Sequence, residues 1–184
     1  MNARDEVSYR LALSEGFLAE AEEDRELQRW RSCVDNSQLS VENAGKAVLT
    51  LFGATPKTHD PAREVAALLR TTDVPADIRQ VLTAMLADLL ALGPAEHFMT
   101  DYRDESQHRL PWDLFDQQSA EEAIAAARRA AAGARRATEA MRAWQAQQAG
   151  AANGVVTAAQ QGPAPSANGE ADHGAPTTAD RQRT

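Results

Sequence analysis

The amino-acid sequence predicts an all-α protein, a four- to five-helix and mostly antiparallel bundle with a disordered C-terminal tail. Apolar residues recur at helical spacing in several long stretches, and no stretch alternates apolar and polar residues as a half-buried strand does. The composition changes sharply at Gly150, after which large apolar side chains almost vanish. We therefore expect one helical domain over residues 5–149 and a disordered tail over residues 150–184.

Two apolar stripes predict the first two helices. The first stripe comprises Val7, Leu11, Ser14, Leu18 and Ala21. The second comprises Trp30, Val34, Ser37, Val41, Ala44, Val48 and Leu51. Gly53 follows the second stripe and is a candidate C-cap, because glycine readily adopts the left-handed conformation that often ends a helix.

The middle of the chain predicts a short helix and then a longer one. Asp60 and Pro61 form an N-cap and a first-turn proline, which open a helix to about Leu69. Residues 75–92 carry the next apolar stripe, and the Gly-Pro pair at 93–94 ends it. Residues 95–102 have room for one further helical turn, and the polar residues 103–111 are predicted to form a loop.

A capping box at residues 119–122 predicts the start of the last helix, which should run to about Ala149. Small side chains let a neighbouring helix approach closely, so the mostly small core stripe of this helix also suits a homodimer. That stripe comprises Ala123, Ile124, Ala127, Ala131, Ala134, Thr138 and Met141.

Arginines occupy the opposite face of the last helix. Arg128, Arg135 and Arg142 are seven residues apart, so they lie along one side of it. Three interpretations stay open for this arginine strip. It is a solvated surface, a contact strip for RNA or other phosphates, or a face that pairs with the acidic first helix.

Composition excludes several classes of protein. No apolar run is long enough to cross a membrane, and the charged first thirty residues do not form a secretory signal peptide. Cys33 is the single cysteine, and no Cys/His cluster has zinc spacing, so the sequence predicts a cytoplasmic protein with neither a metal nor a cofactor. The net charge of -8 argues against a general nucleic-acid coat protein but is compatible with a small basic site.

One arginine–histidine pair has chemistry suited to RNA. His108 follows Arg103 by five positions in the polar stretch before the last helix. A histidine can move a proton to or from the ribose 2′-hydroxyl or the leaving oxygen, and an arginine can brace the phosphate with its planar fork. Spacing alone does not separate this pair from a chance arrangement, because arginine is abundant in the chain.

The residues 30–47 resemble the second helix of HEPN domains, a family of nucleotide-binding helical domains from higher eukaryotes and prokaryotes. The family's Gln-x-x-x-Glu-x-x-x-Lys-Ala pattern matches at Gln38, Glu42, Lys46 and Ala47. Residues 53–60 are similar to the segment before the family's next helix, and residues 102–115 with the Ala-rich helix after them are similar to its C-terminal part. The resemblance covers about residues 5–147 and implies a HEPN-like bundle that commonly dimerises.

The resemblance also implies a function. Active HEPN ribonucleases carry Arg, a polar residue and then His before the last long helix, which Arg103, Asp104 and His108 match. This implies a metal-independent ribonuclease of toxin–antitoxin or defence type, and a small nucleotidyltransferase-fold partner. Two alternatives remain. One is a catalytically inert HEPN module that binds a nucleotide or a protein partner, and the other is a purely structural helical dimer.

Overall fold

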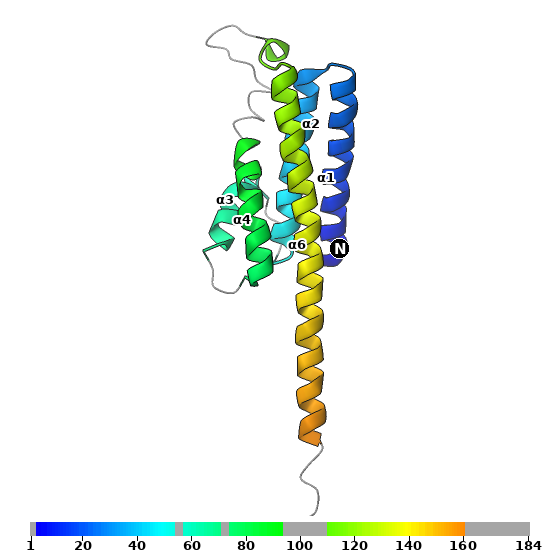
Figure 1. The fold of residues 1–184 in the computed structure, drawn as a ribbon, viewed down its shortest axis with the longest axis vertical. Coiled ribbons are helices and arrows are strands. Elements are labelled where there is room, and N and C mark those ends of the chain that lie inside the picture. The colour runs from blue at the N-terminus through cyan, green and yellow to red at the C-terminus, as the bar shows by residue number, and fades with distance from the viewer. Residues whose placement is uncertain (1–2, 54–56, 71–73, 94–109, 161–184) are drawn as a thin grey trace, which may run out of the picture. The chain divides into compact units, whose positions relative to one another are not determined.

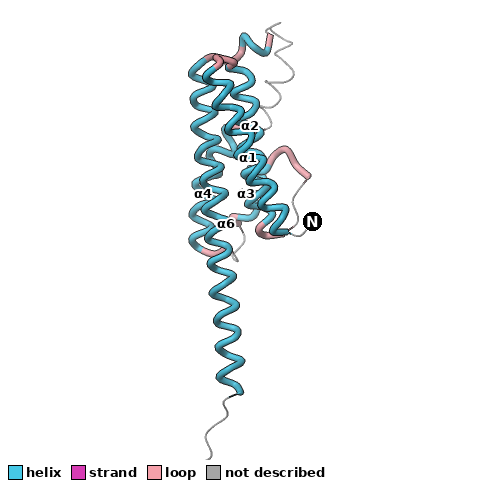
Figure 2. Tube along the Cα trace, turned by 90° about the vertical axis from the view of Figure 1, so that its right-hand side faces the viewer, coloured by secondary structure: helices cyan, strands magenta, loops and turns pink. Residues whose placement is uncertain are grey.

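A computed structural model describes residues 3–53, 57–70, 74–93 and 110–160 of the chain. Within these ranges the chain forms five α-helices and one 3₁₀ helix and no strand, which confirms the predicted all-α fold (Figures 1 and 2). The elements are α1 (Ala3–Glu26), α2 (Trp30–Thr50), α3 (Pro61–Leu68), α4 (Ala76–Ala91), the 3₁₀ helix η1 (Pro111–Asp113) and α6 (Gln117–Gln160).

The chain divides into two compact units, Met1–Gln147 and Gln148–Thr184. The prediction that the last helix ends at Ala149 is wrong, because α6 continues to Gln160. Residues 150–160 contain no proline, and their two glycines each cost only about 1 kcal/mol relative to alanine in a helix. The rest of the predicted disordered tail, residues 161–184, lies outside the described residues.

Helix α2 lies at the centre of the first unit, where it contacts α1, α3, α4 and η1. The predicted stripe from Val34 to Val48 is buried, but so are polar residues on other sides of the helix, including Gln38, Glu42 and Asn43. A helix with neighbours on most sides has little polar surface left, so its polar side chains must find partners inside the bundle.

Helices α1 and α2 form an antiparallel hairpin with a tight connection. Gln28 adopts a left-handed φ of 56°, and the backbone N–H of Arg29 donates to the carbonyl of Asp24 at 2.8 Å. This pattern is a Schellman motif, which ends α1. The buried carboxylate of Asp24 then accepts from the Asn36 amide at 2.9 Å and pairs with Arg29 at 2.7 Å, so it ties the end of α1 to α2.

The predicted start of α3 is confirmed, whereas two other predicted caps are wrong. The Asp60 carboxylate accepts from the backbone N–H of Arg63, and Pro61 occupies the first turn. Gly53 is not a left-handed cap, because no described glycine has a positive φ. Helix α6 begins two residues before Ser119, whose backbone N–H and hydroxyl both donate to the Asp116 carboxylate. Because it accepts these hydrogen bonds, Asp116 is the N-cap of α6. The same hydrogen bonds lower the pKa of its carboxyl group.

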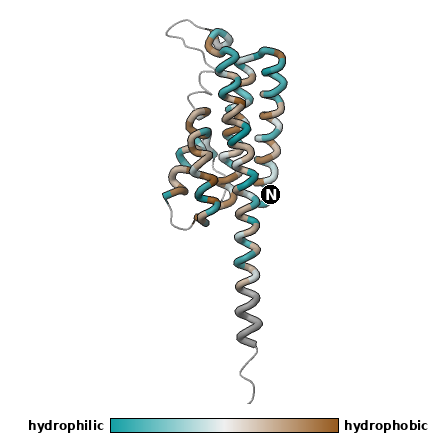
Figure 3. Tube along the Cα trace, in the orientation of Figure 1, coloured by the Kyte–Doolittle hydropathy of each residue, from teal (hydrophilic) through white to brown (hydrophobic). Residues whose placement is uncertain are grey.

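The core of the first unit lies between α2, α4 and the small-residue stripe of α6. Its largest fully buried side chains include Ile78, Leu82, Met85, Leu89 and Ile124. Figure 3 shows that α3 and α4 are richer in hydrophobic residues than α1. The alanine stripe of α6 is buried inside this bundle, so it is not the exposed face that would suit a homodimer.

Gly45 is a point of close approach in α2. A Cβ atom at this position would lie 2.7 Å from the Cβ of Pro61 and 2.9 Å from Cδ2 of Leu89. We expect Gly45→Ala to destabilise the protein, because overpacking costs about 1–3 kcal/mol and exceeds the gain in helix propensity of about 1 kcal/mol. Urea unfolding followed by circular dichroism measures this change.

The matched control for this substitution is Gly16→Ala in α1. Nothing lies within 4 Å of a Cβ atom at Gly16, so only the helix-propensity term applies there. We expect this control to raise the unfolding free energy. Equal stabilisation by both substitutions would contradict the close approach of α3 and α4 to α2.

Candidate functional site

The predicted catalytic residues Arg103, Asp104 and His108 lie outside the described residues. On the N-terminal side of their segment, α4 ends and the backbone N–H of Leu92 donates to the carbonyl of Asp88 at 3.2 Å. On the C-terminal side, the backbone N–H of Asp113 donates to the carbonyl of Leu110 at 3.0 Å and closes η1. The structure therefore fixes the elements that flank the arginine–histidine pair and leaves its geometry a prediction.

The flanking residues form a partly apolar surface. A pocket of about 180 Å³ lies between the end of α4 and the first turns of α6, with Leu92 and Ala123 in its lining. Trp112 in η1 is 65% exposed, four residues after His108. An exposed aromatic ring offers a stacking surface for an unpaired base, and such stacking is worth about 1–3 kcal/mol per base.

The arginine strip of α6 is largely paired with acidic residues. Arg128 contacts Glu22 of α1 at 2.7 Å, and Arg135 contacts Glu15 of α1 at 2.6 Å. Its hydrogen bond with Glu15 raises the pKa of Arg135, so this guanidinium stays charged. At these two positions the strip therefore pairs with the acidic first helix, as one of the three interpretations predicted. Both arginines remain exposed, so their contact with phosphates stays a prediction.

Two further arginines of α6 have different surroundings. Arg129 faces the other side of the bundle and contacts the buried carboxylate of Asp88 in α4 at 2.6 Å. Arg142 lines a pocket with Arg4 and makes no ion pair with any residue of the described ranges. Within the described ranges, Arg128 and Arg135 of the strip are therefore paired with acidic residues and Arg142 is not.

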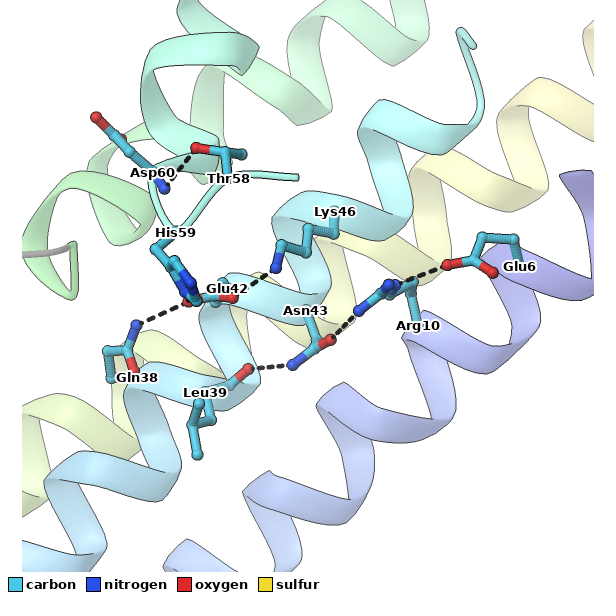
Figure 4. Close-up of polar contacts among 10 residues, drawn as sticks. All are labelled: Glu6, Arg10, Gln38, Leu39, Glu42, Asn43, Lys46, Thr58, His59 and Asp60. Carbon is cyan, nitrogen blue, oxygen red and sulfur yellow. Dashed lines mark hydrogen bonds and ion pairs between the residues drawn. The ribbon is translucent and has the colours of Figure 1, made fainter. Parts of the chain in front are cut away.

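A buried carboxylate, Glu42, is the centre of a polar cluster on α2 (Figure 4). Glu42 is 5% exposed, and its oxygens accept from Lys46 Nζ at 2.7 Å and from the Gln38 amide at 3.3 Å. The His59 ring nitrogen Nδ1 lies 3.3 Å from the same carboxylate, which joins the segment before α3 to α2. We call Gln38, Glu42, Lys46 and His59 the Glu42 cluster.

The charge balance of the Glu42 cluster sets its protonation. Burial alone would raise the pKa of Glu42, but the hydrogen bond and charge of Lys46, followed by those of His59, hold it below its usual value. The carboxylate is therefore ionised and neutralised within the cluster. A carboxylate in this state is a poor general acid or base at neutral pH, so the Glu42 cluster holds elements together rather than performing proton transfer.

Sequence reasoning identified the pattern Gln38, Glu42, Lys46 only as a family signature and did not identify the contact with His59. The spacing of four residues places these three side chains on one face of a helix. No local pattern shows that α2 is surrounded by other helices, and the burial of this charged face follows from that arrangement.

The described part of the chain offers neither a metal-ligand group nor a membrane-spanning helix. No three His, Cys, Asp or Glu side chains in the described ranges are grouped to hold a metal ion. None of the helices described is long and apolar enough to cross a bilayer.

Comparison with known proteins gives one family and a fold. The family model described as HEPN domain matches residues 7–132. A crystal structure of a protein from Thermus thermophilus is 22% identical, with a TM-score of 0.53, and the match covers 74% of this chain and 99% of that one. A crystal structure described as an archaeal HEPN homologue is 23% identical, with a TM-score of 0.47 and coverage of 70% and 94%. No curated protein matches the chain significantly.

Proposed function

Because the chain belongs to the HEPN domain family, we propose that it is a metal-independent ribonuclease of toxin–antitoxin or defence type that uses Arg103 and His108. The observation that carries this proposal is the place of the pair in the sequence. The two residues are five positions apart, they lie between α4 and α6, and they fall inside the matched residues 7–132. An arginine–histidine pair with the same spacing at another place in the chain would not support this proposal.

The proposed reaction is attack by the ribose 2′-oxygen on the adjacent phosphorus. The bond from phosphorus to the 5′-oxygen breaks, which leaves a 2′,3′-cyclic phosphate and a 5′-hydroxyl. His108 moves a proton from the 2′-hydroxyl or to the leaving oxygen, and Arg103 stabilises the charge that builds on the phosphate. Asp104 orients a neighbouring polar group rather than transferring protons.

Two described features support contact with single-stranded RNA. Trp112 offers an exposed ring close in sequence to His108, on which a base could stack. The arginine strip presents the exposed guanidinium groups of Arg128, Arg135 and Arg142 along α6, and the charge of Arg142 is not paired within the described ranges. The net charge of -8 requires that contact with RNA be local, because most of the surface repels it.

The ion pairs of the strip favour a second candidate function. Glu22 and Glu15 neutralise Arg128 and Arg135, which reduces the attraction of this face for a long RNA. A catalytically inert HEPN module that binds a nucleotide or a protein partner needs no extended basic face.

An RNA cleavage assay separates these two candidates. The full chain is incubated with single-stranded RNA in the presence of a metal chelator, and the 3′ ends of the products are identified by mass. Cleavage that leaves 2′,3′-cyclic phosphate ends is expected for the ribonuclease. Intact RNA at micromolar protein would contradict the ribonuclease and favour the inert module.

We also propose that two copies of the chain form a homodimer. Transfer of one proton from the 2′-hydroxyl and another to the leaving oxygen needs two groups, and two copies bring two histidines to a shared site. Light scattering at micromolar concentration should therefore give about twice the chain mass of 19.9 kDa. A strictly monomeric chain would exclude a shared site. The small nucleotidyltransferase-fold partner is a further proposal, which co-purification with that protein would test.

A further inference from the structure

The ion pairs between α1 and α6 follow a regular antiparallel register. Arg128 pairs with Glu22, and seven residues further along α6 Arg135 pairs with Glu15, seven residues back along α1. Seven residues are two turns, or about 10.5 Å along a helix axis. The ion pairs therefore have the same spacing along both helices and form a ladder, and the next pair of facing positions in this ladder can be identified.

At the next position of this ladder the acidic residue is missing. Arg142 continues the arginine series, but the residue seven positions before Glu15 is Ser8. A pocket at this level confirms the register, because it brings Arg4 and Val7 of α1 together with Met141 and Arg142 of α6. Arg142 thus occupies the place of a paired arginine without a carboxylate opposite it.

The lining of this pocket combines the two arginines Arg4 and Arg142 with apolar side chains. Its volume is about 80 Å³, and Val7 and Met141 in its lining are buried. Arg4 and Arg142 are both exposed, and neither has an ion pair among the residues that the structure describes. The neighbouring carboxylate of Glu6 is engaged by Arg10 at 2.9 Å. The charge of the two arginines is therefore not balanced by this carboxylate.

We propose that Arg4 and Arg142 form a binding site for a phosphate group. Two guanidinium forks from different helices match the several oxygens of a phosphate, and hydrogen bonds between charged partners are the strong ones. A single water needs roughly 10–15 Å³ of such volume, so the pocket accommodates a group of several heavy atoms. The site does not depend on the proposed ribonuclease activity.

The phosphate can come from RNA or from a free nucleotide, and binding measurements distinguish these sources. The probes are inorganic pyrophosphate, uridine 5′-monophosphate and a ten-nucleotide RNA with 2′-O-methyl groups, which cannot be cleaved through its 2′-oxygen. Titration calorimetry with the full chain measures each affinity. Binding of the oligonucleotide alone identifies RNA as the source, whereas binding of the small probes identifies a free phosphate or nucleotide.

Three variants test the site itself. Arg142→Gln and Arg4→Gln should each weaken binding about tenfold or more, because each removes a charged hydrogen-bonding partner. Ser8→Glu should weaken it to a similar extent with both arginines in place, because the new carboxylate would complete the ladder and pair with Arg142. Arg63→Gln is the matched control, since it removes one exposed positive charge from α3 and should leave the affinity unchanged.

The proposal is overturned if no probe binds at millimolar concentration, or if Ser8→Glu and Arg142→Gln bind as tightly as the original chain. Equal weakening by Arg63→Gln would also overturn it, because it would show only a general effect of net charge. Circular dichroism checks that each variant is folded. If the original chain binds pyrophosphate but does not cleave RNA, the ribonuclease proposal is contradicted and the phosphate site stands.

Discussion

Replacing His108 with alanine should slow RNA cleavage by about 10²–10⁴-fold, which is the usual contribution of a proton-transfer group. The substitution removes the imidazole that moves protons at the 2′-hydroxyl and the leaving oxygen. Initial rates with a fluorescent single-stranded RNA measure the effect at neutral pH. His173→Ala is the matched control, because His173 lies outside the residues 7–132 that match the family, and it should cleave at the original rate.

Substitutions of the neighbouring residues make the test specific. Arg103→Lys keeps the positive charge but loses the planar fork, so it should also be impaired. Asp104→Asn should have a milder effect, since this residue is expected to orient rather than transfer protons. If cleavage survives in His108→Ala, the activity comes from another site or a contaminant.

Replacing Lys46 with methionine should lower the free energy of unfolding by about 3–5 kcal/mol, which is typical when one partner of a buried ion pair is removed. Lys46 lies 2.7 Å from Glu42, and both side chains are almost inaccessible to solvent. The substitution leaves a buried carboxylate whose remaining partners are the neutral Gln38 amide and His59, which is itself 75% exposed in its side chain. Urea unfolding at pH 7 measures the loss. Arg135→Met is the control, since its pair with Glu15 is exposed and contributes about 0–1 kcal/mol.

The pH dependence gives this prediction a second and independent readout. In the original chain the folded pKa of Glu42 is lowered, so its contribution to stability is present above the ordinary value of 4.5 and is lost as the pH falls through the lower folded pKa. In Lys46→Met the burial remains without the lysine, so the pKa of Glu42 should rise above 4.5. The stability difference between the two proteins should therefore shrink as the pH falls from 7 toward 4. A difference that stays constant with pH would contradict the role of the ion pair.

The helices could be predicted from the sequence because each depends on local signals. The stripe of α2 and the Asp60 cap of α3 need only residues within a turn or two. The start of α6 could not be assigned correctly, because Asp116 and Ser119 both resemble caps and the sequence alone does not show which accepts the hydrogen bonds. The end of α6 was placed too early, since the loss of apolar residues at Gly150 removes packing partners without preventing helix formation.

The polar contacts were predictable only in part. The seven-residue spacing of the arginine strip revealed one face of α6, and pairing with α1 was one of three interpretations. The choice between them needed the register of α1 against α6, which places Glu15 and Glu22 beside Arg135 and Arg128. The Glu42 cluster was not predicted, because its burial depends on the elements packed around α2 rather than on its own sequence.

The environment of Cys33 makes the protein's own conformational fluctuations measurable. Cys33 is the single cysteine, it is fully buried in α2, and its Sγ lies 3.8 Å from the Ala120 carbonyl at the start of α6. Burial, followed by the negative charge of Asp24, raises the pKa of this thiol to about 11. At pH 8 only about one thiol in a thousand is ionised, and the thiolate is the reactive form. A thiol reagent therefore labels the chain only when α2 and α6 separate, so the labelling rate reports how often the native bundle opens.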